Sequence, residues 1–167
     1  MRVGILTSGG DCQGLNAAIR AVAKSLYEAA EKSGEDIKII GFADGYKGLI
    51  YGEYSRMSRA DFSGILTVGG TILGTSRQPF KEMRVIDEET KIDKVKKMKE
   101  NYARLNLDCL VILGGNGTQK TANLLREEGL NIVSLPKTID NDIFGTDISF
   151  GFQSACDIAS NVIDCIH

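Results

Sequence analysis

The chain has 167 residues, 43% of them hydrophobic, which is enough for one domain, or one domain and part of another, with a core that needs no disulfide bonds. Twenty basic and 22 acidic side chains give a net charge of -2, which argues against binding nucleic acid or a membrane surface through bulk charge. There is neither an apolar run of about 18 residues nor a signal peptide after Met1. These features indicate a cytoplasmic protein whose partners are small molecules or other proteins.

The first elements predict a parallel sheet. Residues 2–7 (RVGILT) are a short apolar run typical of a strand buried on both faces. After the glycines of SGGD, apolar residues recur at three and four from Gly14, which predicts a helix of about 18 residues. Residues 37–42 form the next apolar run. A strand reached through a helix implies a right-handed crossover, so these two strands should be parallel.

The middle of the chain is less regular. Residues 44–52 (DGYKGLIYG) are glycine-rich, and residues 56–66 show no assignable period. Residues 69–77 (GGTILGTSR) are too polar for a core strand, and we expect them to form a binding loop. Residues 90–105 carry one apolar stripe opposite lysines and glutamate, which predicts an amphipathic surface helix with a solvated charged face.

The strand, glycine turn and helix then repeat. Residues 108–113 (DCLVIL) read as a buried strand, GGNGT follows, and a helix is expected over residues 119–128. A further strand over residues 131–135 leads into PKTIDND. The last helix, residues 152–166, is still in period where the sequence stops, without a capping glycine or proline, so we expect the chain to be truncated.

These patterns predict an α/β fold, with an open, mostly parallel sheet and helices on both faces in a Rossmann-like three-layer arrangement. Ligands of such sheets bind beyond the carboxyl ends of the strands, where helices expose free N–H groups. The loops SGGD, GGNGT and PKTIDND all follow strands. The two glycine loops suit a polyphosphate, although neither matches the dinucleotide or P-loop pattern.

PKTIDND, residues 136–142, is the candidate reacting centre, read here as a short turn. Aspartate and asparagine favour turns, so a purely structural role stays open. In the functional interpretation, one carboxylate takes a hydroxyl proton and the other holds or orients Mg²⁺. Lys137 and Arg77 would then offset charge on a phosphoryl group in transfer.

Five segments together resemble the phosphofructokinase family, in matching order and across nearly the whole chain: LTSGGDCQGLNAAIR, DGYKGL, GGTILGTSR, GGNGT and PKTIDNDIFGTDISFGF. The resemblance implies a glycolytic kinase that phosphorylates the 1-hydroxyl of fructose 6-phosphate, giving fructose 1,6-bisphosphate. It further implies Mg²⁺ as cofactor, ATP or pyrophosphate as donor, and a homo-oligomer, dimer or tetramer.

The resemblance also implies residue roles. Asp140 matches the proton acceptor, Lys137 lies beside it, and Asp142 matches a carboxylate that supports Mg²⁺. Arg20 aligns with a basic residue that lines an effector pocket in bacterial members, but an exposed arginine on a helix needs no such role, so control by an effector stays open. Donor-phosphate contacts are implied for Gly10, Arg77, Gln78, Gly115, Asn116, Gly117 and Thr118, and substrate contacts for Thr138, Ile139 and Asp140.

Two positions depart from the family pattern. Asn116 stands where the family usually has aspartate, so metal binding through it should be weaker or mediated by water. Pyrophosphate users commonly carry an acidic residue at the position of Gly117 and lysine at that of Lys137, whereas many ATP users have glycine at both. This chain combines the glycine of many ATP users at position 117 with the lysine of pyrophosphate users at position 137. The room left by Gly117 favours ATP over pyrophosphate.

The resemblance places a donor-binding domain at residues 1–143 and the start of a sugar-phosphate domain at 144–167. Most of the acceptor pocket would then lie outside the chain, so residues 1–167 alone are predicted to be inactive. A non-catalytic polyphosphate-binding module is the alternative for this chain. A nicotinamide dehydrogenase is disfavoured by the missing fingerprint and by the carboxylate pair.

Overall fold

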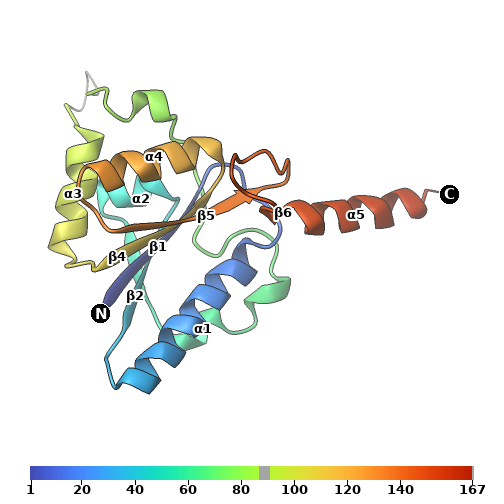
Figure 1. Ribbon diagram of the computed structural model, residues 1–167, viewed down its shortest axis with the longest axis horizontal. Helices are drawn as coiled ribbons and strands as arrows, with labels where there is room; N and C mark the ends of the chain where they lie inside the picture. Colours follow the sequence, from blue (N-terminus) through green and yellow to red (C-terminus); the bar gives the residue numbers. More distant parts are fainter. Residues whose placement is uncertain (87–90, 167) are drawn as a thin grey trace.

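The computed structural model describes residues 1–86 and 91–166 (Figure 1). It confirms the expected α/β class with a six-stranded sheet in the order β3-β2-β1-β4-β5-β6. All neighbouring strands are parallel except β2 and β3, which are antiparallel at one edge. The strands are β1 (Arg2–Ser8), β2 (Lys38–Phe42), β3 (Tyr54–Met57), β4 (Cys109–Gly114), β5 (Ile132–Thr138) and β6 (Phe150–Gly151).

Helices cover both faces of the sheet (Figure 1). On one face lies α1 (Leu15–Ser33), whose buried Leu15, Ile19 and Ala23 pack on the side chains of β1 and β4. On the other face lie α2 (Tyr46–Tyr51), α3 (Lys94–Arg104) and α4 (Asn116–Glu127). Burying each large apolar side chain contributes about 1.5–3 kcal/mol. The two core clusters therefore stabilise β1 and β4, which contribute side chains to both.

Two elements differ from expectation. The glycine-rich segment 44–52 contains the short helix α2. The segment 56–66, which shows no period, begins with the last residues of β3 and continues into two 3₁₀ turns, η1 (Arg59–Phe62) and η2 (Ile65–Thr67). Neither α2 nor β3 is longer than six residues. Such short pieces are stabilised by tertiary packing, here of Tyr46 and Leu49 in the core, rather than by local pattern.

The observed boundaries of three elements also differ from the predicted ones. Helix α3 begins at Lys94 because the Asp93 carboxylate caps it, accepting from Lys96 N–H at 2.9 Å; the expected start at residue 90 lies outside the described residues. Helix α4 begins at Asn116 rather than at Gln119. Strand β5 continues to Thr138, because Pro136 and Lys137 extend its pairing with β4 and β6. The first half of PKTIDND is therefore strand, not turn.

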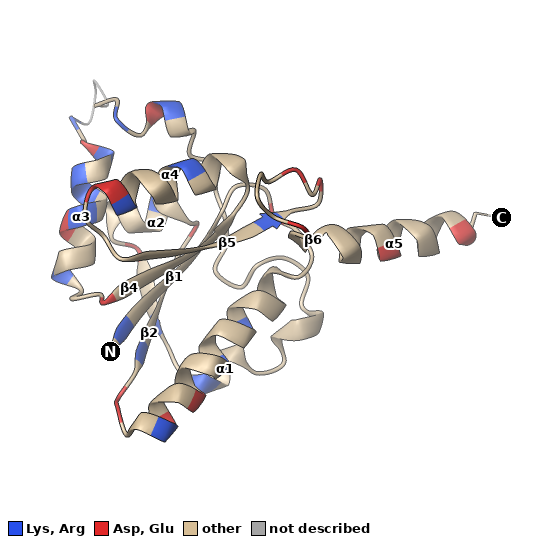
Figure 2. Cartoon of the chain, in the orientation of Figure 1, with Lys and Arg blue, Asp and Glu red and all other residues tan. Residues whose placement is uncertain are grey.

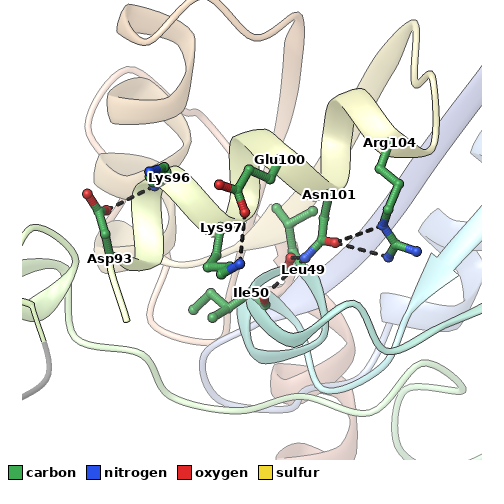
Figure 3. A network of polar contacts seen from close by, with 8 residues as sticks. All are labelled: Leu49, Ile50, Asp93, Lys96, Lys97, Glu100, Asn101 and Arg104. Atoms are coloured by element: carbon green, nitrogen blue, oxygen red, sulfur yellow. Dashed lines mark hydrogen bonds and ion pairs between the residues drawn. The ribbon is translucent and has the colours of Figure 1, made fainter. Parts of the chain in front are cut away.

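The charged surface of α3 is solvated as predicted. Lys97 and Glu100 pair at 2.9 Å with both side chains about half exposed, which contributes little to stability. Asn101 links two helices, because its amide donates to the carbonyl oxygens of Leu49 (2.8 Å) and Ile50 (3.0 Å) and so connects α3 to the end of α2 (Figure 3).

The last helix, α5 (Phe152–Asp164), extends away from the rest of the chain (Figure 1). None of its residues is buried, and it carries few charges (Figure 2). In the described part of the chain, no helix is long and apolar enough to cross a membrane.

Candidate active site

A cleft of about 540 Å³ opens at the carboxyl ends of β1, β4 and β5. It is the place where an open parallel sheet binds ligands, because strand ends and helix N-termini converge there. The structure brings every sequence-predicted site residue to this one cleft. Its lining includes Gly10, Arg77, Gln78, Gly115, Asn116, Gly117, Thr118, Lys137, Thr138, Ile139, Asp140 and Asp142.

The loop after β1 forms one wall. Gly9 turns the chain with φ 93°, a left-handed conformation that glycine adopts without strain. The 69–77 loop holds this turn, since Gly9 N–H donates to Ser76 O (3.1 Å) and Thr75 Oγ1 donates to Gly9 O (2.8 Å). The expected binding loop therefore mainly supports the glycine turn and delivers Arg77, whose guanidinium lies about 4.0 Å from the position of a Cβ on Gly10.

The N-terminus of α4 forms the second wall. Gly115 precedes the helix, and no side chain caps its first turn, so the N–H groups of Asn116, Gly117 and Thr118 face the cleft without helical partners. A Cβ added to Gly117 would meet nothing within 4 Å. The helix end is therefore open at Gly117, and uncapped helix N-termini of this kind suit anions.

Two hydroxyl groups fix this helix end to its neighbours. Thr118 Oγ1 donates to Ser8 O at 3.2 Å, so this hydroxyl is used within the protein. The hydroxyl of Tyr46, a fully buried residue of α2, donates to Thr118 O at 2.9 Å. Burial raises the pKa of Tyr46 far above its ordinary value, so it stays a neutral donor. The first turn of α4 is thus held from β1 and from α2.

The third wall is PKTIDND. Lys137 is only 4% exposed, and its ammonium group donates to Gly10 O, so it links β5 to the glycine turn. Asp140 is exposed at the rim. Its N–H donates to Thr138 Oγ1 at 3.1 Å, and that hydroxyl lies 3.4 Å from Asp140 Oδ2. Asp140 thus lines the cleft from a local turn that Thr138 stabilises.

Asp142 lies next to the first residue of α4. The Asn116 amide nitrogen donates to its backbone oxygen (3.3 Å) and lies 3.4 Å from Oδ2, which leaves the amide oxygen of Asn116 free for another ligand. Within residues 1–86 and 91–166, no three His, Cys, Asp or Glu side chains gather closely enough to hold a metal ion. Mg²⁺ commonly binds through one or two carboxylates and substrate phosphates, so the donor set of Asp142 and Asn116 fits it.

The charges of the cleft are mixed, since its lining includes Arg77 and Lys137 as well as Asp11, Asp140 and Asp142. Cys12 also lines the cleft and is half-buried. Burial raises the pKa of the Cys12 thiol, an effect that the Lys137 ammonium partly opposes. Of these charged residues only Lys137 is buried, while Asp140 and Asp142 are exposed, so the cleft offers both cations and carboxylates to a ligand.

Comparison with known proteins identifies the family. The family model described as Phosphofructokinase matches residues 2–167. The chain belongs to the phosphofructokinase family. The ATP-dependent 6-phosphofructokinase of Spirochaeta thermophila is 58% identical over 98% of this chain, and ATP-dependent 6-phosphofructokinase 3 of Bacteroides thetaiotaomicron is 50% identical over 100% of it. The chain spans less than half the length of these two relatives, 44% and 48%.

Solved structures of the phosphofructokinase family share this fold. Phosphofructokinase from Saccharomyces cerevisiae superimposes with a TM-score of 0.82 at 30% identity, covering 99% of this chain and 24% of that one. A pyrophosphate-dependent phosphofructokinase from Marinobacter aquaeolei, 20% identical, superimposes with a TM-score of 0.71 over 90% of this chain and 37% of its own.

Several cleft residues of this family member were not singled out from sequence. Asp11 belongs to the SGGD loop, whose glycines alone indicate a ligand site, and its carboxylate accepts from Thr71 N–H at 3.2 Å. Phe80, 40% exposed, follows the Arg77 loop and carries no pattern of its own. Arg20, by contrast, lies outside the cleft and donates to Phe62 O at 2.5 Å.

Proposed function

We propose that the protein containing this chain transfers the terminal phosphoryl group of a polyphosphate donor to the 1-hydroxyl of fructose 6-phosphate. The observation that carries the proposal is that one cleft is lined by two carboxylates, two cations and an uncapped helix N-terminus. Phosphoryl transfer needs this combination, because the protein's part is mostly to position the groups and to offset developing charge.

Asp140 is the proposed general base. Its carboxylate is exposed at the rim, where an acceptor hydroxyl can reach it, and the turn at Thr138 orients it. A positioned carboxylate that takes the hydroxyl proton contributes about 10²–10⁴-fold to the rate. Thr138 and Ile139, which line the cleft beside it, would contact the sugar phosphate.

The donor phosphates would lie deeper in the cleft. The free N–H groups of α4 and the backbone of Gly10 suit phosphate oxygens, while Arg77 and Gln78 close the other side. Lys137 brings a positive charge next to Gly10. A charge about 4 Å from a phosphate oxygen contributes about 4 kcal/mol at an effective dielectric near 20, before desolvation.

Asp142 and Asn116 would hold Mg²⁺ on the rim side of the donor. When bound, Mg²⁺ neutralises phosphate charge and helps to orient the donor. Asn116 supplies a neutral amide oxygen where an aspartate would add a charge, so Asp142 carries the larger share of the attraction.

We favour ATP over pyrophosphate as the donor. The open space at Gly117 supports this choice, since the α-phosphate of a nucleotide needs room there and pyrophosphate does not. The names of the two relatives cited above, both ATP-dependent, support it as well. The buried Lys137 is compatible with either donor.

We also propose that residues 1–143 form the donor-binding domain and that residues 144–167 begin a sugar-phosphate domain. The support is α5, which extends from the sheet with no buried residue and with exposed Ile158, Val162 and Ile163. We expect the full-length protein to be a dimer or tetramer, which sedimentation velocity can measure.

Initial rates with ATP and with pyrophosphate, at equal fructose 6-phosphate and Mg²⁺, test the proposal in the full-length protein. We expect turnover with both substrates present, and a higher kcat/KM for ATP. Equal or better use of pyrophosphate would refute the donor assignment, and the absence of turnover with either donor would refute the activity.

A second candidate applies to residues 1–167 alone: polyphosphate binding without turnover. The observation favouring it is that, among the described residues lining the cleft, the basic side chains are Arg77 and Lys137, and both lie near Gly10. Calorimetric titration of this fragment with tripolyphosphate should show binding, while turnover at rates typical of enzymes would contradict this candidate.

A further inference from the structure

Asn141 lies between the two carboxylates of the cleft and has an unusual backbone conformation. Its φ is 51°, in the left-handed region that residues other than glycine seldom adopt, although asparagine tolerates it best. Asp140 and Asp142 both line the cleft, whereas Asn141 does not. The left-handed residue therefore turns the chain so that its two acidic neighbours face the same space.

The side chain of Asn141 hydrogen-bonds to the backbone of the loop that follows it. Its amide nitrogen donates to Asp147 O at 3.0 Å, and its amide oxygen accepts from Ser149 N–H at 2.8 Å. The loop from residue 142 to residue 149 thus folds back on a single amide group. Both partners are backbone groups, so the contact depends on the path of the chain rather than on the side chains of the loop.

Ser149 carries the connection back to the sheet. It is 2% exposed, and its hydroxyl donates to Thr138 O at 2.7 Å, at the last residue of β5. The next residues, Phe150 and Gly151, form β6 and pair with Lys137 and Thr138. The loop that carries the carboxylates is therefore tied at its two ends to β5 and braced inside by Asn141.

We infer that Asn141 is a positioning residue, whose two amide hydrogen bonds and left-handed backbone set the directions of Asp140 and Asp142 in the cleft. The inference rests on the proposed phosphoryl transfer. Asn141 acts through its neighbours, since it does not line the cleft itself. A misplacement of about 1 Å at a reacting group can cost about a hundredfold in rate, so loss of this brace should lower kcat.

Asn141→Gly in the full-length protein tests the inference, because glycine keeps the left-handed backbone and removes only the amide. Asn106→Gly is the matched control: Asn106 has φ 48° but is exposed at the end of α3, away from the cleft. We expect kcat per folded molecule to fall about 10- to 100-fold in N141G and to stay within about twofold in N106G, with KM for ATP changed less than threefold in both.

Hydrogen exchange supplies a readout independent of activity. The Ser149 amide should lose its protection in N141G and keep it in N106G. A kcat of N141G within twofold of the parent, or a fall in kcat with Ser149 still protected, would overturn the inference. Should N141G not fold, Asn141→Asp takes its place, with the same expected fall in kcat, because its carboxylate would face the Asp147 carbonyl. An inactive parent would refute the proposed function too, whereas an active parent with an unaffected N141G refutes this inference alone.

Discussion

Replacing Gly117 by aspartate should separate stability from donor use. A Cβ at this position meets nothing within 4 Å, and the residue lies in the first turn of α4, so a side chain can begin there without a clash. Replacing glycine in a helix by alanine contributes about 0.5–1 kcal/mol to stability, and a carboxylate near a helix N-terminus contributes about 0.3–1 kcal/mol. Both Gly117→Ala and Gly117→Asp should therefore unfold at or slightly above the temperature of the parent.

The use of ATP, in contrast, should fall in these variants, and most in Gly117→Asp. A carboxylate about 5 Å from a phosphate oxygen costs about 3 kcal/mol at an effective dielectric near 20, or about a hundredfold. In the full-length protein, kcat/KM for ATP should thus fall about a hundredfold in Gly117→Asp and less than tenfold in Gly117→Ala. Steady-state rates and thermal denaturation of the same preparations provide both quantities.

Undiminished use of ATP by Gly117→Asp would refute the assignment of this position to the donor phosphates. An equal loss in both variants would show that bulk alone, not charge, decides donor binding there. A marked fall in the unfolding temperature of Gly117→Asp would contradict the open space seen at Gly117.

Three further predictions concern the same cleft. Asp140→Asn should lower kcat about 10²–10⁴-fold in a coupled assay, and unchanged kcat would remove Asp140 from the role of base. Tyr46→Phe deletes the buried donor to Thr118 O and should lower the free energy of unfolding by about 1 kcal/mol in denaturant titrations, which an unaltered midpoint would contradict. Burial raises the pKa of the Cys12 thiol, so Cys12 should be alkylated by iodoacetamide more slowly than the exposed Cys156 at neutral pH. Its alkylation should accelerate as the pH rises toward that raised pKa. Mass spectrometry of tryptic peptides measures both rates, and faster alkylation of Cys12 would contradict the prediction.

The central strands and the place of the cleft could be predicted because their signals are local. Continuous apolar runs such as residues 108–113 mark strands buried on both faces, and glycines directly after them mark ligand loops. Parallel strands end at one edge, so residues as far apart as Gly10, Asn116 and Asp140 were expected together, and all three line the cleft.

The parts that could not be predicted depend on contacts between distant residues. Tyr46 supports Thr118 across 72 positions of the chain, and Lys137 reaches Gly10 across 127, so neither contact has a local signature. Helix α2 is too short for a recognisable period. The brace at Asn141 was hidden because asparagine between two aspartates reads simply as turn composition.

The most direct test of the account is the identity of the product formed by the full-length protein. With ATP, Mg²⁺ and fructose 6-phosphate, ³¹P NMR should show ADP and a new phosphate ester on the 1-position of the sugar, formed in equal amounts. Inorganic phosphate released without a sugar bisphosphate, or an ester at another hydroxyl, would contradict the proposal that Asp140 accepts the proton of the 1-hydroxyl.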